Sequence, residues 1–258
     1  MKYTLFLLLT ILITPIVQGQ RRDSIVMHGT IDTVLVQEKQ LNKTKDANAG
    51  MRTSKIDVEI LNSNRTKSLA ELLSENSVVY IKSLGQGALA TSSFRGTSST
   101  HTRVNWNGLN INPPMAGSFN FSQIPVFFTD NVELYYGGGN VKNGTGAIGG
   151  SINLSNTPVW DNQIRTRAFA EFGSYSTYTG AASVRVGNNR HSLQTRAYYQ
   201  QSDNDYTYTN KVLTKDPFRE TRKEAQYKQA GFMQEAYFKI SNHSILSANV
   251  WLQYGDRR

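Results

Sequence analysis

A glycine pattern in the stretch NGTGAIGGSINL, residues 143–154, first suggests cofactor chemistry. Gly144, Gly146 and Gly149 have the G-x-G-x-x-G spacing with which a strand-to-helix turn holds the pyrophosphate of a dinucleotide. The letters that follow the glycines, SINL, alternate between polar and apolar residues, and this alternation predicts a strand. A strand offers no helix N-terminus to a phosphate group. The spacing therefore does not predict a nucleotide site.

Other residue types that carry chemistry are scattered along the chain. The histidines, His28, His101, His191 and His243, show no HExxH or similar spacing, and each is expected in a turn or on the surface. The chain has no cysteine, which excludes disulfides, thiolate metal sites, cysteine nucleophiles and a lipoprotein anchor. No Ser-His-Asp arrangement is indicated, so nothing in the sequence supports an enzyme.

One pair of carboxylates is a candidate metal site. Asp203 and Asp205 lie close together in the polar stretch SDNDYTYTN, which is predicted to be a loop. Calcium binds carboxylate oxygens in such loops, so a calcium ion is one interpretation and a solvated turn is the other. No other cofactor is expected.

The first residues predict export from the cytoplasm. Lys2 is followed by an apolar run over residues 5–13 and by Val17 and Gly19 at the small-residue cleavage positions. These features predict a secretory signal peptide over residues 1–19. The apolar run is too short for a membrane-spanning helix, which needs about 20 apolar residues. The net charge of +9 comes from dispersed Lys and Arg, so no nucleic-acid partner is expected for an exported chain.

The next part of the chain divides into a polar segment and a compact domain. Residues 20–53 are polar and predicted to be flexible, apart from the apolar, β-branched island DTVLV at residues 32–36. The pattern of apolar and turn residues over residues 54–158 predicts an α+β domain with many short strands and long loops. The stretch KIDVEIL, residues 55–61, alternates and predicts one of these strands.

A helix and further strands complete the predicted α+β domain. Ser68 and Glu71 have the spacing of a capping box at the start of SLAELLSEN, which predicts a short helix. After Val78, short strands are separated by glycine-rich and polar turns.

From residue 159 on, the hydrophobic pattern changes to long segments with period-2 alternation. Segments of nine to eleven residues each place apolar side chains on one face and polar side chains on the other; they are 164–172, 178–186, 192–200, 230–240 and 245–254. Transmembrane β-barrel strands need about 9–11 residues with this alternation, joined alternately by short turns and longer loops. A soluble β-sandwich, the alternative, has strands of about 5–6 residues and a core face richer in Val, Ile and Leu. The pattern therefore favours barrel strands.

Five strands are too few to close a barrel, and unpaired strand edges are not tolerated in lipid. The sequence thus leads us to expect a fragment of a longer protein, an interrupted gene, or a sheet completed by other chains.

The layout and several motifs resemble the TonB-dependent outer-membrane receptors. SLAELLSENSVVYIKSLGQGALATSSFRGTSSTHTRVNWNGLNIN is similar to the plug sequence of this family, and the run IPVFFTDNVELYYGGGNVKNGTGAIGGSINL is similar to its segment ending in YGxxAIGGxINI. The resemblance covers residue 32 to about residue 200 and is nearest to the vitamin B12 receptor branch, from which siderophore receptors differ little here. In such a plug, the glycines provide tight turns with positive φ and close packing.

The resemblance implies an α+β plug domain over residues 54–158 inside an antiparallel transmembrane β-barrel, of which residues 159–258 form the first five strands. It implies a location in the outer membrane of a Gram-negative bacterium, in contact with lipid. The implied function is active uptake of a bulky, scarce nutrient, either cobalamin or a ferric siderophore. The alternative is a plug-only binding or signalling module that engages TonB or a ligand without transport.

The resemblance also implies sites. Asp32, Thr33, Val34, Leu35 and Val36 correspond to the TonB box, which binds TonB in its complex with ExbB and ExbD. Substrate contacts are implied for two apical loops of the plug, namely Gly85, Gln86, Gly87, Ala88, Leu89, Asn112, Pro113, Pro114, Met115, Ala116, Gly117 and Ser118. Arg95 is implied to pair with glutamates of the barrel wall beyond residue 258.

Three positions depart from the family pattern. Asn107 replaces an acidic residue, Tyr136 replaces an arginine, and GGGNVKNG replaces the usual GPxSxLYG. The departures at Tyr136 and at GGGNVKNG concern the charge contacts that the plug of this family makes with the barrel wall.

Overall fold

The computed structural model describes residues 52–138, 146–210 and 218–257. The described residues do not include the predicted signal peptide (residues 1–19), the predicted TonB box (residues 32–36) or nearly all of the predicted flexible segment (residues 20–53). Gly144 also lies outside them.

The α+β domain is built on a mixed sheet with the strand order β1-β6-β7-β4-β5. Strands β4 and β7 are parallel, and the other neighbours in this sheet are antiparallel. A separate antiparallel pair, β2–β3, carries the loop at residues 84–89. The strands of the domain are β1 Arg52–Lys55, β2 Tyr80–Ser83, β3 Ala90–Ser93, β4 Thr102–Trp106, β5 Leu109–Asn110, β6 Asn131–Tyr136 and β7 Gly150–Ser155.

The predicted helix is confirmed as α4, Leu69–Asn76. The Oγ atom of Ser68 accepts from the backbone N–H of Glu71 at 3.3 Å, and the Glu71 carboxylate accepts from the backbone N–H of Ser68 at 2.8 Å. This reciprocal capping box satisfies two N–H groups at the helix start. The leucines of α4 are buried in the core together with Leu61, Val104, Val132, Leu134, Ile152 and Leu154.

The prediction of a strand over residues 55–61 is wrong. Strand β1 begins at Arg52, two residues before the expected start of the domain, and Val58–Ser63 form helix α3. Asp57 adopts an extended conformation at the N-cap, and Glu59 lies in the first turn, where a negative charge favours a helix. The alternation of KIDVEIL therefore covered the end of a strand and the start of a helix. The remaining short helices of the domain are 3₁₀ turns at Ser99–His101, Phe121–Gln123 and Val126–Phe128.

The glycines of the opening motif shape a turn and a closely packed strand. Gly146 has a φ of +96°, and a Cβ atom at Gly149 would collide with the hydroxyl group of Thr97. Strand β7 follows directly, as predicted, in place of a phosphate-binding helix. The glycines thus serve the packing of this domain.

Asn107 and Gly108 form the turn between β4 and β5, with φ values of +48° and +85°. Positive φ at both central residues is typical of a type I′ hairpin, for which Asn-Gly is a preferred sequence. The Oδ1 atom of Asn107 also accepts from the backbone N–H of Asn156 at 2.9 Å. Asparagine therefore provides both the turn conformation and an acceptor where the family has an acidic residue.

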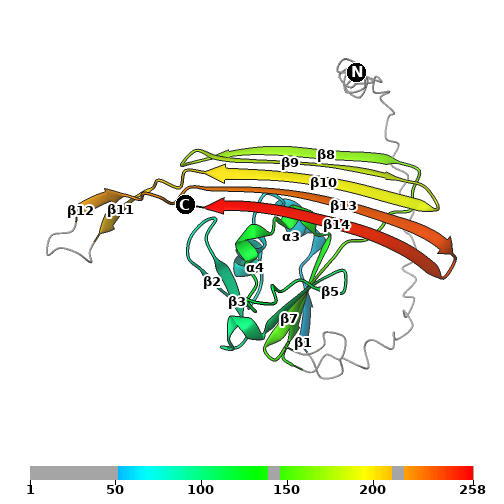
Figure 1. Cartoon of the computed structure of the whole chain (residues 1–258), viewed down its shortest axis with the longest axis horizontal. Coiled ribbons are helices and arrows are strands. Elements are labelled where there is room, and N and C mark those ends of the chain that lie inside the picture. Colours follow the sequence, from blue (N-terminus) through cyan, green and yellow to red (C-terminus); the bar gives the residue numbers. More distant parts are fainter. Residues whose placement is uncertain (1–51, 139–145, 211–217, 258) are drawn as a thin grey trace, which may run out of the picture. The chain divides into compact units, whose positions relative to one another are not determined.

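The second sheet contains the five predicted long strands, which lie side by side in the order β14-β13-β10-β9-β8 (Figure 1). All neighbouring pairs are antiparallel. We call this sheet the long sheet. Its strands are β8 Ile164–Gly173, β9 Thr177–Gly187, β10 His191–Ser202, β13 Tyr227–Ser241 and β14 Ser244–Arg257.

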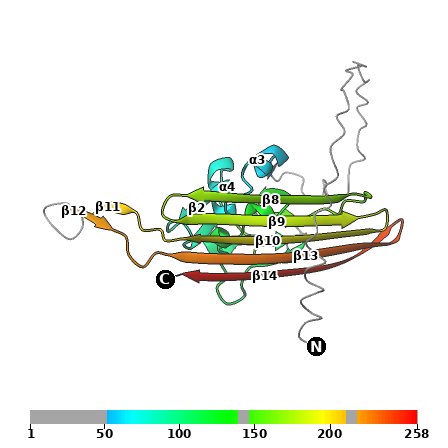
Figure 2. The same ribbon diagram turned by 90° about the horizontal axis from the view of Figure 1, so that it is seen from above.

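A short turn joins β8 to β9 at one end of the long sheet, whereas the connection from β10 to β13 at the same end is long. Tight turns join β9 to β10 and β13 to β14, as the sequence predicts. Figure 2 shows that the long connection between β10 and β13 extends beyond the opposite end of the strands. The polar stretch predicted there as a loop contains an unpredicted two-stranded hairpin, β11 Thr207–Asn210 with β12 Phe218–Thr221.

The two faces of the long sheet differ as the alternation predicts. One face carries exposed apolar side chains, among them Ile164, Phe172, Val184, Leu246, Val250 and Leu252. The other face carries Ala181, Arg196, Tyr198, Met233 and Glu235, all of which are buried. Within the described ranges, no helix has the length and apolar character needed to cross a membrane.

Candidate ligand pocket and the contact between domain and sheet

Aromatic side chains make the apolar part of the contact between the α+β domain and the long sheet. Phe127 packs edge-to-face on Phe169 of β8, with ring centroids 5.1 Å apart. Phe128 contacts Tyr198 of β10 and Trp251 of β14, with centroid distances of 6.3 Å and 6.0 Å. Edge-to-face pairs of this kind add to the stabilisation that comes from burying the rings.

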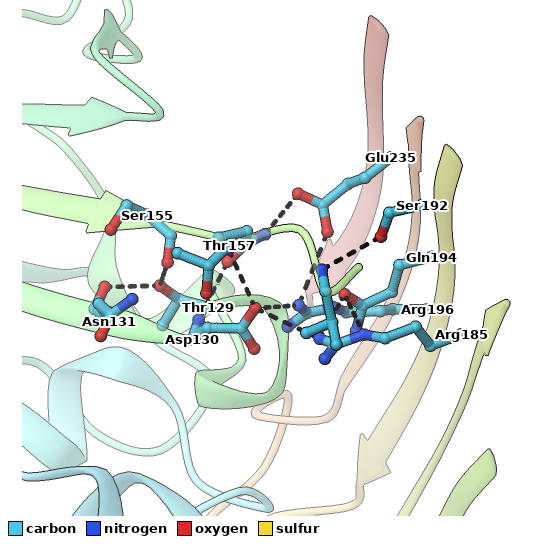
Figure 3. A network of polar contacts seen from close by, with 12 residues as sticks. Thr129, Asp130, Asn131, Ser155, Thr157, Arg185, Ser192, Gln194, Arg196 and Glu235 are labelled. Atoms are coloured by element: carbon cyan, nitrogen blue, oxygen red, sulfur yellow. Dashed lines mark hydrogen bonds and ion pairs between the residues drawn. The ribbon is translucent and has the colours of Figure 1, made fainter. Parts of the chain in front are cut away.

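Arg196, on β10, is the centre of the polar part of this contact (Figure 3). Its side chain is only 2% exposed. One guanidinium nitrogen, Nη1, donates to the backbone oxygen of Phe127 at 2.8 Å, and Nη2 donates to Oδ2 of Asp130 at 2.8 Å. Nη2 also lies 3.6 Å from Oε2 of Glu235 on β13. A buried guanidinium needs such partners, and two of them belong to the α+β domain.

Glu235 and Asn156 extend the network. Glu235 has no exposed side-chain surface, and its Oε1 atom accepts from Asn156 Nδ2 at 2.8 Å and from the Tyr237 hydroxyl at 3.1 Å. Oε2 accepts no hydrogen bond within the described part of the chain, so its main compensation is the charge of Arg196. Asn156 also donates to the backbone oxygen of Phe128 at 3.0 Å and accepts from the Asp130 N–H at 3.0 Å.

Arginines surround Asp130. Arg185 of β9 lies 3.6 Å from its Oδ2 atom and donates to Gln194 at 2.7 Å. Arg65 donates to the backbone oxygen of Thr129 at 2.7 Å, and burial lowers the pKa of its guanidinium while the negative charge of Asp130 opposes that shift. Among the described residues, the arrangement consists of ion pairs and hydrogen bonds between the domain and the long sheet. Its chemistry is the ionic attachment of a domain to a sheet.

Sequence reasoning missed this network. The alternation indicated only that Arg196 and Glu235 lie on the polar face of their strands. Nothing in the sequence indicated that Asp130, which precedes Arg196 by 66 residues, would contact them. Arg95, the predicted contact, is exposed and makes no hydrogen bond or ion pair with the residues that the structure describes. Its pairing with a barrel glutamate stays a prediction.

The close approach of Phe128 to β13 requires a glycine at position 231. A Cβ atom at Gly231 would lie 2.7 Å from Cε2 of Phe128, whereas one at Gly180 of β9 would meet nothing within 4 Å. We expect Gly231→Ala to lower the free energy of unfolding by about 1–3 kcal/mol, because the ring must shift. Gly180→Ala, the matched control, should leave it unchanged or raise it by up to about 1 kcal/mol.

Denaturant unfolding of both variants in detergent micelles, followed by tryptophan fluorescence, measures this difference. Equal stabilities of the two variants would contradict the close contact at Phe128.

The two apical loops predicted to bind substrate meet at a pocket of about 830 Å³. Of the predicted residues, Leu89, Pro113, Ala116 and Ser118 line it. The remaining lining residues come from β4, β5 and the residue after it, the segment 119–124 and β14. Sequence reasoning did not identify them as pocket residues; they are Trp106, Leu109, Asn110, Ile111, Phe119, Asn120, Gln123, Ile124, Trp251, Gln253 and Gly255.

The other predicted loop residues do not line this pocket. Asn112 holds its loop together, since Oδ1 accepts from the Val104 N–H at 2.7 Å and Nδ2 donates to the backbone oxygens of Thr102 and Gly117. Gly87 packs against the ring of Tyr227. Gly85, Gln86, Pro114 and Met115 are exposed, and Ala88 is buried. Substrate contact at these positions stays a prediction.

The carboxylates of Asp203 and Asp205 are both exposed. In the described residues no group of three or more His, Cys, Asp or Glu side chains is arranged to hold a metal ion. Calcium binding by this pair stays a prediction.

The chain is similar to known proteins in both sequence and fold. Residues 45–151 match the family model TonB-dependent Receptor Plug Domain. The chain is 34% identical over 139 residues, or 51% of its length, to the vitamin B12 transporter BtuB of Vibrio cholerae serotype O1 (strain M66-2), of which it covers 23%. It is 36% identical over 101 residues, or 39% of its length, to BtuB of Photobacterium profundum, of which it covers 17%.

The fold is similar to that of the siderophore receptor PirA from Acinetobacter baumannii, with a TM-score of 0.62 and 14% identity. This similarity covers 82% of the chain and 32% of PirA. The chain thus spans less than a quarter of the length of either BtuB protein.

Proposed function

Because this chain belongs, through its plug domain, to the TonB-dependent outer-membrane receptors, we propose that it serves the active uptake of a bulky nutrient across the outer membrane. One observation carries the proposal. The α+β domain, which is this plug, packs on the polar face of an antiparallel sheet whose other face is apolar and exposed. A sheet with these two faces is suited to separate lipid from a lumen that the domain occupies. The proposed activity is transport and not catalysis.

The proposed location is the outer membrane. The predicted signal peptide at residues 1–19 would direct export, and the exposed apolar side chains of the long sheet would face lipid. The exposed Tyr178, Tyr199 and Tyr254 suit the interfacial aromatic girdles of such barrels.

The proposed energy source is the TonB complex with ExbB and ExbD. TonB would bind residues 32–36 by strand addition, because an apolar, β-branched segment can offer its backbone N–H and C=O groups to a partner sheet. The contact at Arg196 and Asp130 would hold the α+β domain in place when no force acts on it.

The proposed ligand is cobalamin or a ferric siderophore. The sequence relatives support cobalamin, since both are vitamin B12 transporters, and the fold neighbour is a siderophore receptor. The pocket between the apical loops would receive this ligand.

Uptake measurements test the proposed function. The protein is expressed from its full native reading frame in a bacterial strain that lacks its own cobalamin and siderophore receptors. Radiolabelled vitamin B12 and ferric siderophores are supplied to matched strains with and without TonB. We expect accumulation of one ligand class only in the strain with TonB. Accumulation that is equal without TonB, or accumulation of neither class, would contradict the proposal.

A further inference from the structure

The apical loop at residues 84–89 is carried by a hairpin that has little support of its own. Within the loop, the Leu84 N–H donates to the Leu89 backbone oxygen at 3.0 Å, and the Ala88 N–H donates to that of Gly85 at 3.1 Å. The loop joins β2 to β3, and these strands form a two-stranded sheet separate from the mixed sheet. A two-stranded hairpin by itself is at best marginally stable in water. The position of the loop therefore depends on contacts with other parts of the chain.

Tyr227, the first residue of β13, supplies one of these contacts. It is only 2% exposed, and its ring lies against the backbone of Gly87. A Cβ atom at position 87 would lie 2.3 Å from Cδ1 of the ring and would displace it. Gly87 also has a φ of +66°, a conformation that favours glycine. Position 87 thus admits the Tyr227 ring because it is a glycine.

Asn204 contacts the same loop from the other arm of the connection between β10 and β13. It is 5% exposed, and its Nδ2 atom donates to the backbone oxygens of Gln86 at 3.5 Å and of Ala225 at 3.3 Å. One amide group therefore joins the plug loop to both arms of the connection. The connection that bears the hairpin β11–β12 is thus bonded to the plug loop at its base.

Further hydrogen bonds fix the base of this connection. The Asp203 N–H and the Ser202 hydroxyl both donate to the backbone oxygen of Tyr175, in the turn between β8 and β9, at 3.0 Å and 3.1 Å. Across the two arms, the Arg222 N–H donates to the Tyr206 backbone oxygen at 2.9 Å, and the guanidinium donates to the Tyr206 hydroxyl at 2.6 Å. The base is therefore attached to the long sheet independently of the plug, and it can support the plug loop.

Resting on the proposed function, we propose that Tyr227 is a positioning residue for ligand binding. It holds the apical loop at residues 84–89 on the base of the β10–β13 connection, so that loop and hairpin β11–β12 move as one unit. Leu89 of this loop lines the pocket. The apparent Kd of a ligand rises as the fraction of molecules in the binding conformation falls. The contact at Tyr227 therefore sets the affinity of the pocket without touching the ligand.

Distances between spin labels test the inference without a ligand. The protein is expressed from its full native reading frame, with any cysteine outside residues 1–258 replaced by serine, since residues 1–258 contain none. One label pair, on Gln86→Cys and Thr207→Cys, joins the plug loop to the hairpin, and both positions are exposed. The control pair, on Met115→Cys and Thr207→Cys, joins the hairpin to the other apical loop, where Met115 is fully exposed. Pulsed electron paramagnetic resonance in detergent measures the width of each distance distribution.

We expect Tyr227→Ala to broaden the 86–207 distribution and to leave the 115–207 distribution unchanged. Tyr227→Phe should keep the 86–207 distribution narrow, because it retains the ring and removes only a buried hydroxyl that has no partner among the described residues. An unchanged 86–207 distribution in Tyr227→Ala would overturn the inference. Broadening of both pairs would also overturn it, because the residue would then support the whole plug and not this loop.

A substitution on the plug side of the contact gives an independent result. Gly87→Ala places a methyl group where the Tyr227 ring lies and should broaden the 86–207 distribution as Tyr227→Ala does. Gly96→Ala is the matched control, because Gly96 has a similar φ of +77° but a Cβ atom there would meet nothing within 4 Å. It should leave the distribution narrow. Equal widths in the two alanine variants would contradict the contact.

Binding of vitamin B12 connects the loop to the proposed function. Tyr227→Ala should weaken binding by about tenfold if the loop is in place in about a tenth of the molecules, and Tyr227→Phe should restore it. An unchanged Kd in Tyr227→Ala, together with a broadened 86–207 distribution, would overturn the positioning role and leave the proposed function standing. Absence of binding and uptake of either ligand class by the unaltered protein would contradict the proposed function, whereas the label distances would still decide the contact.

Discussion

Replacing Arg196 with methionine is expected to lower the free energy of unfolding by about 3–5 kcal/mol, because it removes one partner of a buried ion pair. Methionine fills a similar length of side chain but leaves Glu235, which is fully buried, without its cationic partner. It also removes the 2.8 Å bonds to Asp130 and to the Phe127 backbone oxygen. Denaturant unfolding in detergent measures the loss.

Arg165→Met is the matched control. Arg165 is also an arginine of the long sheet paired with an aspartate, Asp161, but its side chain is 47% exposed. Exposed pairs contribute about 0–1 kcal/mol, so the control should be nearly as stable as the unaltered protein.

A double-mutant cycle decides whether the Asp130–Arg196 pair itself joins the domain to the sheet. We expect Asp130→Asn and Arg196→Met to be non-additive, with a coupling of about 0.5–3 kcal/mol. In cells, either single change should increase entry of small antibiotics, because the α+β domain is held less firmly in the lumen. Additive effects on stability together with unchanged antibiotic entry would show that the pair does not attach the domain.

The long strands could be predicted from sequence because their signal is local. In β8, β9, β10, β13 and β14, apolar and polar side chains alternate along the strand, so each strand carries the period-2 pattern by itself. The helix α4 is equally local, since Ser68 and Glu71 satisfy each other within one turn. Each of these elements was predicted within a few residues of its observed bounds.

The contacts that form the sites could not be predicted because they join distant parts of the chain. Asp130 meets Arg196 only after the domain docks on the long sheet, and Trp251 reaches the pocket from β14 while the loops come from the α+β domain. The error at residues 55–61 has a different cause. The end of strand β1 and the start of helix α3 both lie within residues 55–61, and their combined pattern was taken for one strand. Asp57 was not recognised as the N-cap of the helix.

A proline at position 35 is expected to abolish uptake. Residues 32–36 are proposed to bind TonB through backbone hydrogen bonds, and proline lacks the N–H group and fixes φ. Leu35→Pro should therefore prevent strand addition while leaving the pocket between the apical loops unaltered. Leu35→Ala, the control, keeps the backbone donor and should reduce uptake much less.

Binding and uptake of the same labelled ligand, measured side by side on cells that express the unaltered protein, Leu35→Pro or Leu35→Ala, test energy coupling most directly. We predict that Leu35→Pro binds ligand at the cell surface with an unchanged Kd and accumulates none inside. Leu35→Ala should both bind the ligand and accumulate it. Uptake by Leu35→Pro at the rate of the unaltered protein would contradict TonB-driven transport through this segment.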